Sequence, residues 1–171
     1  MTTIASRVDV DRCTPSQLWA ALEPEVRLAA ARSLYAHDWA GTPTKREADA
    51  TLMMALRFRE AAVRQLPVAR RAEYLAKSAR PGDSLASSLL LALHLEERRP
   101  MLAAFLDALA IPHENGLIAE DHEPTPPEPA QLEKAAKELE GRFSAADVDL
   151  YLSTLYVLDR DTWKGVRPLL K

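Results

Sequence analysis

A helix that is apolar almost all round constrains this chain more than any other feature. Residues 84–97 read Ser-Leu-Ala-Ser-Ser-Leu-Leu-Leu-Ala-Leu-His-Leu-Glu-Glu, and the run from Leu89 to Leu93 leaves no polar side. Such a helix is normally buried on more than one side, so other helices must surround it. A second helical pattern over residues 100–111 completes a predicted helical hairpin, with Asp83 as the N-cap of its first helix.

Helix-start signals recur along the rest of the chain. Thr14–Gln17 is a capping box with proline at the first helical position, Thr44–Glu47 is a second capping box, and Ser144 begins a late helix. An apolar stripe from Ala48 to Leu66 predicts one helix of about six turns after the second box. The sequence therefore predicts an all-α fold of about eight helices in antiparallel pairs, arranged as a compact bundle or a short α–α superhelix.

One junction between helices has a family resemblance. Leu22 to Leu34 resembles the helix junction of a HEAT repeat, in which a proline-acid turn precedes a helix that begins with Val-Arg and continues with small residues. The resemblance covers this stretch alone. It implies that the predicted superhelix, if the chain forms one, is HEAT-like.

Proline content divides the chain into four predicted segments. Residues 1–13 alternate only weakly and predict a loose N-terminal arm. Residues 14–111 predict the helical core, and residues 112–129, with five prolines, predict an acidic Pro-rich loop. Residues 130–171 predict a C-terminal helical pair that packs on the core, so that the whole chain is a single domain.

Charge is unevenly distributed along the chain. Residues 57–99 carry nine Lys or Arg and five Asp or Glu, whereas residues 100–150 carry three and eleven. We prefer to interpret these as two solvated faces; the alternative is a basic and an acidic side that orient a partner or a second copy. The net charge of −3 argues against a dedicated nucleic-acid binder.

Several classes of protein are disfavoured by what the sequence lacks. A single cysteine, Cys13, excludes an intrachain disulfide and fits a reducing compartment. No apolar run approaches the length of a membrane-spanning helix, so we expect a cytoplasmic protein without a membrane partner. Neither glycine-rich nucleotide-binding motif occurs, and no cofactor is predicted.

The candidate metal ligands lie in the loop that follows the predicted hairpin. His113, His122 and Glu123 offer the imidazole and carboxylate groups that zinc or iron uses. Their spacing does not match a helical His-Glu-x-x-His pair, so the alternative is a solvated acidic loop with a tight turn at Asn115-Gly116.

Three further residues are candidate binding groups. His94 lies inside the apolar helix, where it is either a general base positioned by Glu97 or a helix-end histidine facing the terminal carbonyls. Arg70 and Arg71 belong to a basic face over residues 57–80 that phosphate groups would suit, although few aromatic residues are interleaved with it.

The preferred functional interpretation is a non-enzymatic protein–protein interaction or scaffold domain. Its partner would be a protein or peptide, or a second copy in a homodimer, bound by apolar burial with flanking charge complementarity. One alternative is a small enzyme or metal-binding protein that uses the His113–Glu123 loop with His94. Another is a weak nucleic-acid binder that uses the basic 57–80 face.

Overall fold

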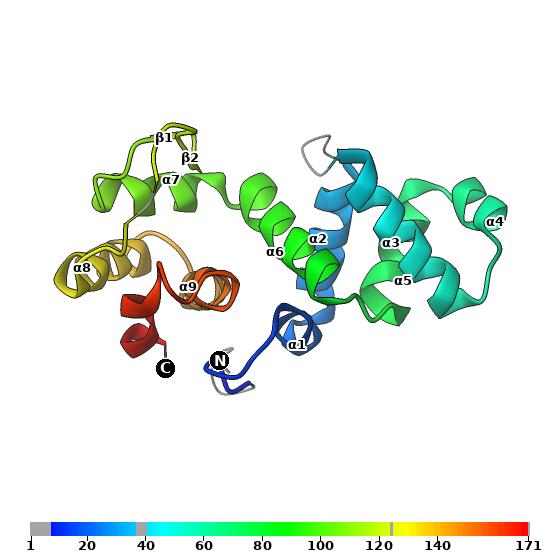
Figure 1. Cartoon of the computed structure of the whole chain (residues 1–171), viewed down its shortest axis with the longest axis horizontal. Helices are drawn as coiled ribbons and strands as arrows, with labels where there is room; N and C mark the ends of the chain where they lie inside the picture. The colour runs from blue at the N-terminus through cyan, green and yellow to red at the C-terminus, as the bar shows by residue number, and fades with distance from the viewer. Residues whose placement is uncertain (1–7, 37–40, 124, 171) are drawn as a thin grey trace. The chain divides into compact units, whose positions relative to one another are not determined.

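The computed structural model describes residues 8–36, 41–123 and 125–170, which form two compact units. We call residues 14–97 the continuous unit, and the described parts of 1–13 and 98–171 the split unit. The described residues are mainly helical, with one sheet of two short strands, so the predicted all-α fold is confirmed (Figure 1). No helix among them is long and apolar enough to cross a membrane.

The continuous unit contains six helices within its described residues. They are α1 (Pro15–Ala21), α2 (Pro24–Ala36), α3 (Gly41–Leu56), α4 (Glu60–Gln65), α5 (Val68–Ser78) and α6 (Asp83–Glu97). α2 packs along α5 and α6, and α6 also contacts α1 and α3. The apolar helix is thus surrounded as expected, with only Leu91 of its leucines left exposed.

Side-chain hydrogen bonds hold the first turn of α1 in place. The predicted capping box is present: the Gln17 N–H donates to Thr14 Oγ1, and the Thr14 N–H donates to Gln17 Oε1. Pro15 has no N–H to satisfy, and the Ser16 N–H donates to Asp83 Oδ1 at 3.0 Å. Asp83 was predicted to cap α6; instead it lies in the first turn of α6 and caps α1.

The predicted six-turn helix after Thr44 is wrong at both ends. α3 begins at Gly41, three residues before the capping box, and it ends at Leu56. Arg57 adopts a left-handed backbone with φ of 55°, and the Phe58 N–H reaches back to the Met53 carbonyl at 3.2 Å. This is a Schellman-type ending without glycine, and it separates α3 from α4.

The split unit begins with the described part of the predicted N-terminal arm, residues 8–13. Val10 and Cys13 are buried in it. The remaining elements are α7 (Arg99–Ala108), β1 (His113–Glu114), β2 (Leu117–Ile118), α8 (Pro129–Glu140), α9 (Ala145–Leu158) and the 3-10 helix η2 (Lys164–Leu169). Ser144 caps α9 as predicted, because its hydroxyl accepts from the Asp147 N–H.

An aromatic cluster forms part of the core of the split unit. Phe105 of α7 is fully buried, and its ring meets the Tyr151 ring edge-on at 5.3 Å between centroids. The Trp163 ring lies 5.9 Å from the same phenylalanine, measured between ring centroids. The predicted core over residues 14–111 includes helices of both units, and the predicted division into segments stays a prediction.

Candidate functional site

A cleft between α3 and α4 is a concave surface of the continuous unit. Its volume is about 440 Å³, and its lining comprises Arg46, Asp49, Ala50, Met53, Glu60 and Arg64. Ala50 and Met53 supply the apolar part, and four charged side chains supply the rest. Glu60 and Arg64 pair with each other along α4, one turn apart.

The corner of the chain around α4, which we call the α4 corner (residues 53–70), exposes large apolar side chains. Met54 is 76% exposed, Val68 is 47% exposed and Phe58 is 43% exposed. Within α4 itself only Val63 is buried. Among the described residues, just two other large apolar side chains are exposed, Leu91 and Leu117, so apolar exposure is concentrated at this corner.

The α4 corner is also basic. Four exposed arginines lie among the apolar residues along the chain: Arg57, Arg59, Arg64 and Arg70. Figure 1 shows α4 at one end of the continuous unit, linking α3 to α5. Arginine is suited to carboxylates because its planar guanidinium donates two parallel hydrogen bonds.

Asp49 connects the cleft to the interior of the unit. Its carboxylate accepts a hydrogen bond from the Tyr35 hydroxyl at 2.9 Å and two from Arg71 Nη1 at 3.1 and 3.3 Å. The Arg71 guanidinium also lies over the Tyr35 ring, 5.2 Å from its centroid. Burial, assisted by the neighbouring Asp49 carboxylate, raises the pKa of Tyr35 well above its ordinary value. Three helices are thereby joined at one carboxylate.

Arg70 and Arg71, which the sequence placed together as binding candidates, have different environments. Arg71 is engaged inside the unit by Asp49 and Tyr35. Arg70 is exposed and donates to Glu73 Oε2 at 2.8 Å along α5. The two side chains therefore do not present a common basic surface.

The predicted loop after residue 111 contains a β-hairpin that holds His113. Its Nδ1 accepts from the Gly116 N–H at 3.1 Å, which puts the ring proton on Nε2, and Nε2 lies 3.1 Å from Asp107 Oδ1. Asn115 and Gly116 have φ of 49° and 85°, as a two-residue primed turn requires. His113 thus links the turn to α7.

The other metal candidates, His122 and Glu123, lie after the hairpin. His122 is half-buried, and Glu123 is exposed. Over residues 8–36, 41–123 and 125–170, no three His, Cys, Asp or Glu side chains form a group that could hold a metal ion. The metal hypothesis gains no geometric support and stays a prediction.

His94 is buried in the last turn of α6, within the continuous unit. The His113–Glu123 loop belongs to the split unit. His94 and that loop belong to different units, and their predicted pairing stays a prediction.

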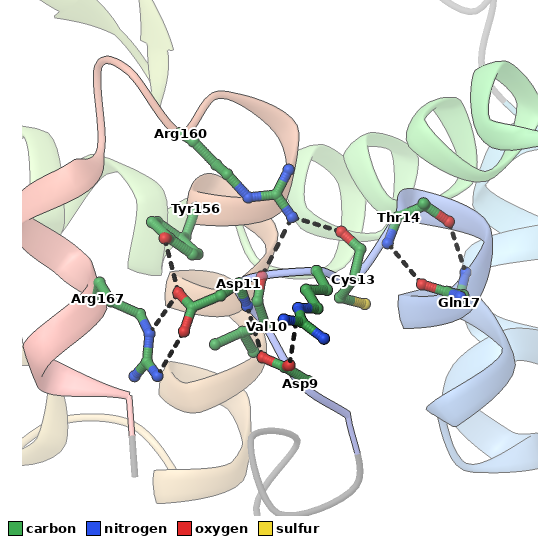
Figure 2. Close-up of polar contacts among 10 residues, drawn as sticks. Asp9, Val10, Asp11, Cys13, Thr14, Gln17, Tyr156, Arg160 and Arg167 are labelled. Carbon is green, nitrogen blue, oxygen red and sulfur yellow. Dashed lines mark hydrogen bonds and ion pairs between the residues drawn. The ribbon is translucent and has the colours of Figure 1, made fainter.

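A second carboxylate network fixes the start of the split unit (Figure 2). Asp11 accepts from Arg167 Nε at 2.7 Å, from Arg167 Nη2 at 2.9 Å and from the Tyr156 hydroxyl at 2.9 Å. These bonds, that from Arg167 foremost, lower the pKa of Asp11. Arg160 donates to the carbonyl oxygens of Val10 and Cys13, and its guanidinium lies 5.6 Å from the centre of the Tyr156 ring.

The sequence interpretation missed the α4 corner because it treated residues 48–66 as one helical stripe. The signal was present in Arg57-Phe58-Arg59, where a large apolar residue stands between two arginines just before an acidic helix start at Glu60. Asp49 was missed because nothing in its neighbours marks it as the acceptor for Tyr35 and Arg71.

A hollow of about 460 Å³ lies on α8, and it is a weaker candidate for a binding site than the cleft. Its lining, Ala130, Glu133, Lys134, Lys137 and Glu138, comes from one helix. Lys137 Nζ bonds Glu133 Oε1 at 2.7 Å, so the hollow is space between long, mutually paired surface side chains.

The chain matches no protein-family model, no curated protein and no solved structure. A proposal about its function therefore rests on the geometry described above.

Proposed function

We propose that this chain is a non-enzymatic α-helical interaction domain whose α4 corner binds an acidic, partly apolar segment of another protein. The observation that carries the proposal is the joint exposure of Met54, Phe58 and Val68 among four arginines. Exposed apolar side chains rimmed by charge are typical of protein-binding surfaces.

The charge balance of the adjoining cleft supports an acidic partner. Asp49 is already matched by Arg71, and Glu60 by Arg64. Arg46 adds a further positive charge to the lining. A carboxylate that approaches this side of α3 therefore meets a net positive potential, which favours encounter and orientation of an acidic segment.

The nucleic-acid alternative has weaker support. Arg71, which was predicted to contact phosphate groups, is engaged inside the unit by Asp49. Exposed aromatic residues for base stacking are represented at the corner by Phe58 alone.

Selection of peptides from a random display library on the full chain tests the proposal. We expect enriched peptides to combine Asp or Glu with Leu or Phe. Binding should fall about tenfold or more in Phe58→Asp, which places a negative charge among the apolar contacts. Arg59→Glu should weaken binding and reduce its salt dependence.

Leu91→Asp is the matched control, because it changes another exposed apolar residue of the same unit outside the corner. It should bind the selected peptides like the unaltered chain. Peptides without acidic residues, or equal binding by Phe58→Asp and Leu91→Asp, would contradict the proposal.

A further inference from the structure

The hairpin of the split unit presents the chemistry that the α4 corner is proposed to bind. Leu117 is 44% exposed, and it is the only exposed large apolar residue among the described residues of that unit. The register pairs it with Glu114 across the turn. Exposed acidic side chains follow at Glu120, Asp121 and Glu123.

The hairpin is held in one conformation before any partner binds. Besides the two contacts of His113, the turn lies directly on α7: a Cβ at Gly116 would be 3.0 Å from Leu102 Cβ and 3.2 Å from the Arg99 carbonyl oxygen. Leu117 and Glu114 are therefore presented by a fixed turn, and binding costs little conformational entropy.

The two surfaces are complementary in charge. The α4 corner displays apolar residues among arginines, and the hairpin displays a leucine among carboxylates. A corner facing a corner, or a hairpin facing a hairpin, brings like charges together and is disfavoured. Only contact between the two unlike surfaces satisfies both the charges and the apolar side chains.

We infer that the acidic segment bound by the α4 corner is the hairpin of a second copy of this chain, so that the protein associates with itself head to tail. The inference rests on the proposed function and names its partner. Such a contact is heterologous, so each copy keeps one free corner and one free hairpin, and association continues beyond a dimer unless a ring closes.

Sedimentation velocity of the full chain over a concentration series tests the inference. We expect the average mass to rise with concentration at 0.1 M salt and the rise to disappear at 1 M, because the Debye length falls from about 10 Å to about 3 Å. A monomer at every concentration would overturn the inference, as would a salt-sensitive change that is independent of concentration.

Charge reversal provides the decisive pair of variants. Arg57→Glu/Arg59→Glu makes the corner acidic, and Glu114→Lys/Glu120→Lys/Asp121→Lys makes the hairpin and the residues after it basic, because only Glu123 then stays acidic there. Each variant alone should stay monomeric, since its two surfaces then have the same sign. A mixture of the two should associate again, because every contact between unlike chains joins opposite charges. Failure of the mixture to associate would overturn the inference.

A variant without any charge change tests whether self-association depends on the conformation of the hairpin as well as on its charge. Gly116→Ala forces a side chain into a left-handed position against α7, so the hairpin must shift while the net charge is unchanged. We expect self-association to weaken about tenfold or more. Unchanged association would contradict a fixed hairpin as the bound element.

The two proposals fail in distinguishable ways. If selected acidic peptides bind the corner while the chain stays monomeric, the proposed function stands and the partner is not a second copy. If the peptides do not bind but the chain associates, and the charge-reversed mixture does not restore association, both proposals are wrong.

Discussion

The two units use the same three residue types around a central carboxylate, but they join very different lengths of chain. In the continuous unit, Asp49 accepts from Tyr35 and Arg71, which lie 14 and 22 residues away. In the split unit, Asp11 accepts from Tyr156 and Arg167, which lie 145 and 156 residues away. Asp49 joins neighbouring helices, whereas Asp11 joins the start of the split unit to residues near the other end of the chain.

Burial separates the two networks further. The Asp49 and Arg71 side chains are each 19% exposed, whereas Asp11 and Arg167 are 47% and 42% exposed. Hydrogen bonds to charged groups are worth more where water competes less, and a charge left behind there costs more. The continuous unit therefore depends more on a single carboxylate. The split unit spreads its attachment over Asp11, two arginines and buried apolar residues.

Removing a central core side chain tests whether the units lose stability separately. Phe105→Ala deletes the ring that contacts Tyr151 and Trp163, and should cost about 3–5 kcal/mol. Hydrogen exchange on the full chain should then show lost protection in α7, α8 and α9. Leu90→Ala is the counterpart in the continuous unit, where it should cost about 2–5 kcal/mol. Equal loss throughout the chain from either variant would show that the units unfold together.

The two carboxylates should differ in what their removal costs. Asp49→Ala leaves Arg71 and the Tyr35 hydroxyl without their shared acceptor, and should lower the free energy of unfolding by about 2 kcal/mol. Asp11→Ala should cost less, because its arginine remains open to water. Chemical denaturation measures both values, and a larger loss from Asp11→Ala would reverse our ranking of the networks.

Each unit also has a helix that ends on a left-handed residue without glycine. Arg57 follows α3, and Ala110 follows α7; both have φ of 55°, and the next N–H in each case bonds back across the turn. A left-handed non-glycine residue costs about 1–2 kcal/mol, so Arg57→Gly and Ala110→Gly should each raise stability by about 1 kcal/mol. Ala104→Gly, inside α7, is the control and should lower stability. A loss of stability in both glycine variants would contradict this account.

The smallest expected effect concerns acid. The bonds from Arg167 and Tyr156 hold the pKa of Asp11 below its ordinary value of 3.8. A group whose pKa is lowered by folding stabilises the folded state above its unfolded pKa, and the contribution is lost as the pH falls through the folded value. The difference in stability between the unaltered chain and Asp11→Asn should therefore be constant above pH 3.8 and shrink below it. Growth of that difference in acid would mean that the carboxylate is not held in its charged form.

Sequence patterns predicted the helices well wherever the signal was local. Thr14 and Ser144 each precede a helix at the predicted position. The errors lie where the backbone or a distant partner decided. Arg57 breaks a continuous apolar stripe through its own left-handed turn, and Asp83 caps another helix because the chain folds back on it.

The candidate site was less predictable than the fold. His113 stood out through its chemistry, but its Nδ1 accepts from the turn and its Nε2 contacts Asp107 of α7. Met54 and Val68 gave no such signal, because periodicity assigns apolar residues to a core and cannot tell which of them the neighbouring helices leave uncovered. Asp49 could not be predicted as a site residue either, because its partners, Tyr35 and Arg71, come from two other helices.

The separation of Asp11 from Arg167 has a consequence during synthesis. Arg167 is added 156 residues after Asp11, which at ordinary rates of translation takes on the order of 10 s. Through that interval Val10 and Cys13 have no completed core to enter, although all 84 residues of the continuous unit are synthesised well before it ends. A nascent chain would therefore contain a complete continuous unit while the split unit is still incomplete. The apolar side chains near Asp11 would stay accessible to chaperones for the longest time.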